Sequence, residues 1–143
     1  MSEQNKALVR RSYEEVWNKK NLNFADELYA ANAIDHGLPP NLPPGREGSK
    51  MYIAMYQKAF PDTHMTIEDQ IAEGDKVVTR WTAVGTHTGD LMGIAPTGKR
   101  VTVTGIDVSR FAGGRIVESW GLFDQMSMMQ QLGVMPQPAQ AAR

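Results

Sequence analysis

The spacing of apolar residues changes abruptly after Pro61, and this change constrains the fold more than any other feature of the chain. Before Pro61 the apolar residues recur every three to four positions, which is typical of amphipathic helices. After it they alternate in segments rich in Val, Thr and Trp, which is typical of strands. Helices followed by a meander of strands predict an α+β domain.

Three helices are expected, over residues 3–19, 24–29 and 49–60. The first has an apolar stripe made by Val9, Tyr13, Val16 and Trp17. Asn23 and Ser49 are candidate N-caps for the second and third helices. Residues 33–36 are expected to be a short extended piece, and the proline pairs at 39–40 and 43–44 exclude a helix from the loop that follows.

Four strands are expected to follow, from residue 65 to about 71 and over 76–88, 101–111 and 116–123. Tight turns rich in glycine separate them at 73–75 and 112–115, and a loop with Gly and Pro covers residues 90–99. Asp124 can cap a terminal helix that Gly133 ends. A twisted sheet wrapped around helices forms a cone, so we expect a cone-shaped α+β barrel: three N-terminal helices on a curved, mostly antiparallel sheet. Its open end would admit a ligand.

Length and composition exclude several classes of function. The 143 residues make about one domain, which we place at 1–135, with a disordered tail at 136–143. The net charge of −1 gives no electrostatic case for binding nucleic acid or an anionic membrane. The absence of cysteine excludes disulfides and thiolate metal sites. Because there is neither a signal peptide nor an apolar run of about 20 residues, we expect a cytoplasmic protein.

Two charged residues lie in the middle of predicted strands, Arg80 and Asp107. An unpaired buried charge costs several kcal/mol or more, so each needs a partner if it faces the interior. They could form a structural ion pair, or one of them could face solvent. Alternatively, Asp107 could be a general base, because a carboxylate among Val, Ile and Trp has a raised pKa.

Other polar candidates have simpler alternatives. His36 could lie on the pocket wall or on a surface loop. His87 could hydrogen-bond the backbone of the glycine-rich lip, the segment at 85–98 that is expected at the mouth of the pocket. Asp124 could turn its carboxylate toward the open end instead of capping a helix. The three histidines lie more than twenty residues apart, so no metal site is expected. Neither a phosphate-binding loop nor a serine hydrolase motif is present in the sequence.

Several short motifs together resemble one family. They are VWN at 16–18, DH at 35–36, GREG at 45–48, GTHTG at 85–89, GIAPTGKR at 93–100, GRIVE at 114–118, Asp124, and QLG at 131–133. In this pattern the chain resembles the SnoaL-like polyketide (ester) cyclases of the nuclear transport factor 2-like superfamily. The resemblance implies an α+β cone, a homodimer formed through the sheet, and no metal or organic cofactor. It also implies a small-molecule ligand and ring closure by intramolecular aldol condensation, with an aspartate as the acid/base.

The resemblance transfers to individual positions only in part. When the segment GRI at 114–116 is aligned, the acid/base aspartate of the family falls on Gly121, and its assisting histidine falls on Asp107. His36 corresponds to a polar pocket residue and Trp17 to an aromatic wall. Arg80 matches the strand arginine of the related limonene epoxide hydrolases, but Thr82 and Gly121 stand where those enzymes keep two aspartates. Epoxide hydrolysis by an arginine and two aspartates is therefore not expected.

We expect a cyclase or isomerase, classed as an isomerase or lyase, that acts on a small apolar carbonyl compound. Asp107 is its predicted acid/base and Arg80 or His36 its electrophilic partner. The predicted substrate-binding residues are Trp17, Trp81, Trp120, Gly121, Phe123, Asp124 and His87. One alternative is a binding or accessory domain without catalysis, since a fold can lose its chemistry and keep its pocket. Another is a dimerisation module, whose pocket would be filled by side chains.

Overall fold

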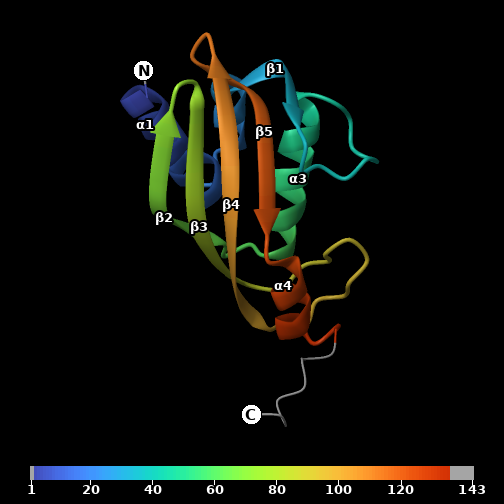
Figure 1. The fold of residues 1–143 in the computed structure, drawn as a ribbon. Coiled ribbons are helices and arrows are strands. Elements are labelled where there is room, and N and C mark those ends of the chain that lie inside the picture. Colours follow the sequence, from blue (N-terminus) through green and yellow to red (C-terminus); the bar gives the residue numbers. More distant parts are fainter. Residues whose placement is uncertain (1, 136–143) are drawn as a thin grey trace.

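A computed structural model describes residues 2–135 as an α+β fold in which helices pack on one curved sheet (Figure 1). The helices are α1 (Ser2–Ser12), α2 (Ala25–Leu28), α3 (Arg46–Ala59) and α4 (Gln125–Leu132), with a π-helix at Tyr13–Asn18 and a 3-10 turn at Leu22–Phe24. The strands are β1 (Tyr29–Asp35), β2 (His64–Glu73), β3 (Lys76–Thr86), β4 (Arg100–Ala112) and β5 (Arg115–Phe123). The tail predicted for 136–143 lies outside the described residues.

The strand order in the sheet is β1-β5-β4-β3-β2. Strands β2 to β5 form the expected antiparallel meander, and β1 adds to its far edge parallel to β5. The edge strands β1 and β2 do not pair with each other, so the sheet is curved but open rather than a closed barrel.

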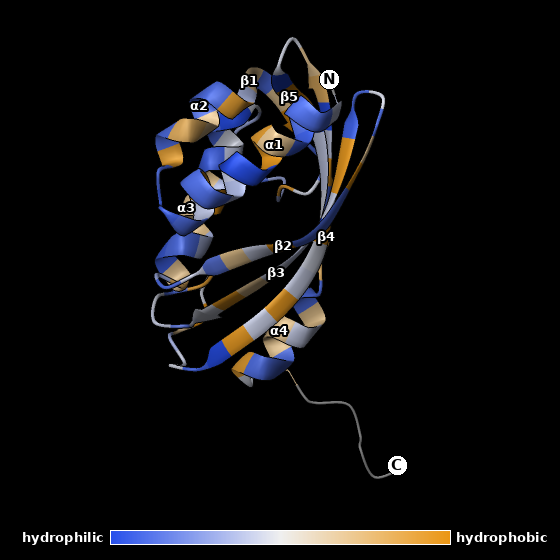
Figure 2. Ribbon diagram, turned by 90° about the vertical axis from the view of Figure 1, so that its left-hand side faces the viewer, coloured by the Kyte–Doolittle hydropathy of each residue, from blue (hydrophilic) through white to orange (hydrophobic). Residues whose placement is uncertain are grey.

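Helices α1 and α3 lie against the same side of the sheet, as Figure 2 shows. Their apolar faces and the inward side chains of the strands make a core whose most deeply buried members include Val16, Leu28, Val77, Leu91 and Leu132. At the lower end of the sheet, α4 packs on β4, and its buried Met128 lies within the same core. The space between these helices and the concave side of the sheet is therefore the place where a site can form.

The first helix does not continue to residue 19 as an α-helix. After Ser12 the chain widens into the π-helix, in which the Lys19 amide donates to the Glu14 carbonyl five residues earlier, at 2.8 Å. Such a turn re-aims the side chains that follow it and is frequent at functional sites. Here it carries Tyr13 and Trp17 to the concave side of the sheet.

Strand β1 is longer than the extended piece that the sequence suggests, which covered residues 33–36 only. It starts at Tyr29, directly after the short α2. Its pairing with β5 is irregular between Tyr29 and Ile34, which hides the period of two that would reveal a strand. The parallel pairing brings Asp35 beside Ser119 of β5.

Candidate functional site

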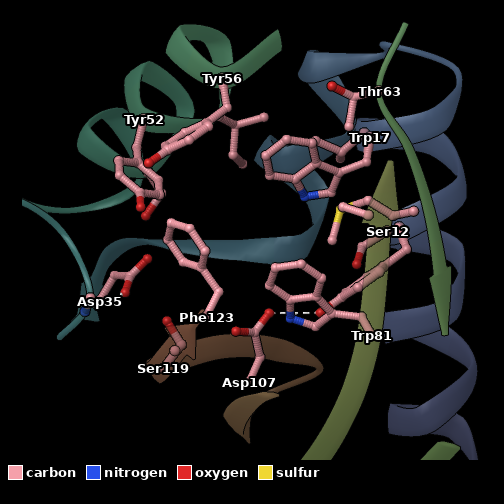
Figure 3. A pocket seen from close by; sticks show the side chains of 18 of the residues that line it. Ser12, Trp17, Asp35, Tyr52, Tyr56, Thr63, Trp81, Asp107, Ser119 and Phe123 are labelled. Atoms are coloured by element: carbon pink, nitrogen blue, oxygen red, sulfur yellow. Dashed lines mark hydrogen bonds between the residues drawn. The ribbon is translucent and has the colours of Figure 1, made fainter. Parts of the chain in front are cut away.

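A cavity of about 200 Å³ lies between the concave face of the sheet, the π-helix and α3. Its wall is mainly apolar and aromatic, and a few polar side chains interrupt it (Figure 3). This cavity is not filled by side chains, whereas a purely structural dimerisation module is expected to have a filled pocket. Pockets of this kind, apolar with a few converging polar groups, are typical of small-molecule sites.

Asp107 is the carboxyl group placed most deeply in this cavity. It lies on β4 between the outward-facing Ile106 and Val108, and it accepts a hydrogen bond from the Tyr13 hydroxyl at 2.7 Å. Burial raises the pKa of Asp107 from its ordinary value of 3.8 to about 6. The Tyr13 hydroxyl and the Trp81 indole lower this pKa, whereas the charge of Asp35 raises it further. A carboxyl with such a pKa can take up and release protons near neutral pH.

Gly121 provides the space that the Asp107 carboxyl occupies. The two residues are partners in the β4–β5 register. A Cβ atom at position 121 would lie 2.6 Å from Oδ1 of Asp107, closer than real Cβ contacts come. Any side chain at position 121 would therefore displace the carboxyl.

Asp35 is a second carboxyl group that lines the cavity, and the sequence analysis did not select it. Its Oδ1 accepts a hydrogen bond from the Gly37 amide at 2.9 Å. Burial raises the pKa of Asp35, while the bonds from Gly37 and the Ser119 hydroxyl and the nearby His36 oppose the rise. The only sequence feature that marks Asp35 is its neighbour His36. Because the sequence did not reveal strand β1 at its full length, it could not predict to which side of the sheet Asp35 points.

All four tyrosines of the chain line the cavity: Tyr13, Tyr29, Tyr52 and Tyr56. Burial is the main cause that raises the pKa of each, so all four hydroxyls remain protonated at neutral pH. They are therefore neutral hydrogen-bond donors. The sequence analysis placed Tyr13 in an apolar helix stripe and did not select the other three. A tyrosine hydroxyl needs a hydrogen-bond partner when it is buried, and this could have marked all four as candidate polar groups of a site.

Five of the predicted substrate-binding residues are among those that line the cavity: Trp17, Trp81, Trp120, Gly121 and Phe123. The rings of Trp17, Trp81 and Phe123 form walls in Figure 3. The Trp120 ring instead stacks on His36, with centroids 5.2 Å apart, and is 36% exposed. Trp120 therefore borders the cavity without closing it.

Neither predicted electrophilic partner of Asp107 lies in the cavity. Arg80 lies on the opposite face of β3, where its guanidinium pairs with the Asp69 carboxylate at 3.2 Å. His36 lies outside as well, and its Nε2 contacts the Glu118 carboxylate at 2.7 Å. The structure therefore does not bring Arg80 or His36 to Asp107, because the alternation of β3 and the end of β1 turn both side chains outward.

Asp124 and His87 also have other roles than the predicted contact with substrate. The Asp124 carboxylate accepts from the Ser127 amide at 3.0 Å and so caps α4. His87 is fully buried in the lip, where its Nδ1 accepts from the Thr97 amide at 3.2 Å. Neither is among the residues that line the cavity, and both have the contacts expected from the structural alternatives.

Within residues 2–135, no group of three or more His, Asp or Glu side chains is arranged to hold a metal ion. Over the same range, none of the helices has the length and apolarity needed to cross a bilayer.

Comparison with known proteins identifies the family. The model of the SnoaL-like polyketide cyclases matches residues 7–132. The chain belongs to this family. Comparison with the curated proteins gives no match.

Several solved structures are similar to this chain over most of its length. IdmH from Streptomyces antibioticus, a proposed polyketide cyclase, is 36% identical, with a TM-score of 0.78, and the match covers 91% of this chain and 99% of IdmH. A proposed polyketide cyclase from Bacillus cereus is 30% identical, with a TM-score of 0.79 and coverage of 92% and 82%. AclR from Streptomyces galilaeus, a proposed hydroxylase, is 25% identical, with a TM-score of 0.85 and coverage of 99% and 88%.

Proposed function

We propose that this SnoaL-like chain is an acid/base enzyme that cyclises or isomerises a small apolar carbonyl compound, with Asp107 as the proton-transfer group. One observation supports this most strongly: the Asp107 carboxyl is held by Tyr13 inside an apolar cavity, where its pKa is about 6. At pH 7 such a group is about ten to one ionised, yet a stronger base than an exposed aspartate.

The chemistry needs no co-reactant. The Asp107 carboxylate removes a proton from the carbon beside a carbonyl, so a C–H bond breaks, an O–H bond forms on Asp107, and an enolate results. The enolate carbon then attacks a second carbonyl of the same molecule and forms a C–C bond. Asp107 returns its proton to the new alkoxide, which regenerates the carboxylate. Without a second carbonyl, return of the proton to another carbon gives an isomerisation.

The pairing of Asp107 with Gly121 explains how this chain can keep acid/base chemistry without an aspartate at position 121. The two positions face each other across β4 and β5, and the carboxyl of one occupies the space beside the other. The family resemblance places its acid/base aspartate at 121. In this chain the carboxyl would enter the same region from the neighbouring strand.

Deuterium exchange tests the proposal without knowledge of the natural substrate. The chain is incubated in D2O with 2-indanone or 2-tetralone, apolar ketones with acidic C–H bonds, and loss of the C–H signal is followed by proton NMR. We expect the unmodified chain to accelerate exchange over buffer, and Asp107→Asn to lower the rate by about 10²-fold or more.

Asp69→Asn is the matched control, because Asp69 lies on the outer face of the sheet and pairs with Arg80. It should exchange both ketones like the unmodified chain. Full exchange by Asp107→Asn would contradict the assignment of the base. Ketone binding by the unmodified chain without any accelerated exchange would favour the alternative, a ligand-binding domain without catalysis.

We also propose that the protein is a homodimer that pairs through the outer face of its sheet. This face carries exposed apolar side chains, among them Ile34, Ile106 and Leu122, of which Leu122 is 83% exposed. Ile106 and Leu122 are register partners on β4 and β5, so they form one continuous patch. Exposed apolar patches of this kind mark interaction sites.

Sedimentation analysis of the unmodified chain and of Leu122→Glu tests the dimer. A dimer that becomes monomeric on substitution, while the melting temperature is kept, supports it. A monomer at all concentrations would contradict it. The cytoplasmic location stays a prediction from the sequence, which cell fractionation can test.

A further inference from the structure

Asp35 is an ionisable group of the cavity to which the chemistry above gives no role. It lies at the end of β1, where the exposed Gly37 also lines the cavity. Figure 3 shows the carboxyl groups of Asp35 and Asp107 directed into the same space, with Phe123 between them in this view. A ligand in this space would meet a carboxyl at two points of its surface.

A glycine lies beside each of the two carboxyls. Gly37 donates its amide to Asp35, and a Cβ on Gly37 would lie 3.2 Å from the Gly121 carbonyl oxygen. On the other side, a Cβ on Gly121 would lie 2.6 Å from the Asp107 carboxyl. Both glycines therefore leave room on the wall of the cavity that a side chain would fill, next to Asp35 and next to Asp107.

The Trp81 indole is a second donor that faces the Asp107 carboxyl. Trp81 is buried, and hydrogen bonding from its indole lowers the pKa of Asp107, although within residues 2–135 its nitrogen has no partner at ordinary hydrogen-bond distance and angle. Asp107 therefore has donors in Tyr13 and Trp81, both of which favour its charged form.

The electrostatics indicate that one space is shared. The negative charges of Asp35 and Asp107 both raise the pKa of Tyr29, and both raise the pKa of Tyr52. Among the other groups facing the pair, Tyr13 and Tyr56 stay neutral, and His36, on the outer side of Asp35, pairs with Glu118. Two like charges in an apolar cavity repel, so a ligand that expels water favours a state with one of the two carboxyls protonated.

We propose that Asp35 is a second catalytic carboxyl, which exchanges a proton with the substrate oxygen while Asp107 exchanges one with carbon. This rests on the proposed function. As the C–H bond breaks toward Asp107, the O–H bond of Asp35 breaks and an O–H bond forms on the carbonyl oxygen, which gives a neutral enol. When the enol carbon bonds to the second carbonyl carbon, Asp35 recovers the enol proton and Asp107 gives its proton to the second carbonyl oxygen. Both carboxyls regain their starting states.

This arrangement also selects the class of substrate. Two carboxyls that share one negative charge repel an anion, so keto acids are excluded and uncharged apolar ketones are favoured. The wall of Trp and Tyr rings suits a ligand with flat rings or a chain that folds into one.

The ketone exchange assay with Asp35→Asn, and proton uptake on binding of 2-naphthol, test the proposal. Uptake is measured by titration calorimetry in two buffers that differ in ionisation enthalpy. The asparagine can still accept from the Gly37 amide, so the fold is expected to persist. We expect Asp35→Asn to lower exchange by about 10²-fold or more while naphthol affinity changes less than about threefold. We also expect uptake of up to about one proton at pH 7 by the unmodified chain, and less by Asp35→Asn.

A second variant and defined outcomes keep the proposal open to refutation. Asp35→Glu keeps a carboxyl and should restore part of the exchange, which a purely structural role does not predict. Unchanged exchange in Asp35→Asn overturns the proposal but leaves the proposed function intact if Asp107→Asn is inactive. A loss of exchange matched by an equal loss of naphthol affinity also overturns it, because it assigns Asp35 to packing. No exchange by the unmodified chain overturns both.

Discussion

Replacing Asp107 by Asn should stabilise the protein at neutral pH. Burial raises the pKa of Asp107 from 3.8 to about 6, which means that the folded state binds this proton more tightly than the unfolded state. As the pH rises through this window, the unfolded chain loses the proton first and folding stability falls. Below about pH 4 the penalty is absent, and above about pH 6 it is complete.

The size of the effect follows from the shift. About two pKa units at about 1.36 kcal/mol each give about 3 kcal/mol as an upper limit. Water in the cavity screens part of it, so we expect about 1–3 kcal/mol. Asn carries no charge and can still accept from the Tyr13 hydroxyl, so the variant gains this amount at pH 7.5 and nothing at pH 4. For a chain of this size the gain is about 3–10 °C in melting temperature.

Thermal unfolding followed by circular dichroism at pH 4 and pH 7.5 measures this difference. Asp69→Asn, which removes an exposed carboxylate, should stay within about 0.5 kcal/mol of the unmodified chain at both pH values. If Asp107→Asn were destabilised equally at both, Asp107 would be a structural partner of Tyr13 and the argument from burial would fail. The variant should therefore be more stable under the same conditions in which it loses activity.

Three further substitutions test the surroundings of the cavity. Tyr13→Phe removes a hydrogen bond that lowers the pKa of Asp107, so NMR of 13C-labelled aspartate should show the midpoint rising about one unit above 6; an unchanged midpoint would contradict the bond. Gly105→Ala places a Cβ against the Trp81 ring and 2.9 Å from the Leu122 carbonyl oxygen, so it should lower the free energy of unfolding in urea by about 1–3 kcal/mol. The control Thr104→Ala, at an exposed position, should lower it by less than about 0.5 kcal/mol. Asp124→Ala should cost about 1 kcal/mol through loss of the α4 cap while ketone exchange persists; a loss of exchange would restore Asp124 to the site.

The sequence predicts the meander and most helices well, because their signals are local. Alternation in β3 to β5 and the glycine turns between them place the strands within one or two residues. The same alternation puts Asp107 on the side of Val103, which is the side that faces the cavity. The π-helix was missed, and β1 was expected only as the extended piece at 33–36 without its parallel pairing, because both depend on contacts with distant residues rather than on period.

Polar partners were harder to predict than strands. The alternation of β3 placed Arg80 and Trp81 on opposite faces of the sheet, but it could not tell which face is concave. Strand β2, which carries the Asp69 partner of Arg80, was predicted from only a few alternating apolar residues. Asp35 and the tyrosines were missed for a different reason. Their importance depends on β1, α3 and the π-helix meeting at one cavity, and no pattern within a single segment records that meeting.

Positions 107 and 121 are best understood as one unit. Because they are register partners on the same side of the sheet, their side chains compete for one volume, and a Cβ at position 121 would lie 2.6 Å from the Asp107 carboxyl in its present position. A carboxyl can enter that volume from either strand. The glycine at 121 therefore does not by itself indicate lost chemistry, since the same glycine is the condition for the carboxyl at 107. Whether a relative with glycine at this position retains an acid/base group should be judged from the residue across the strand pair.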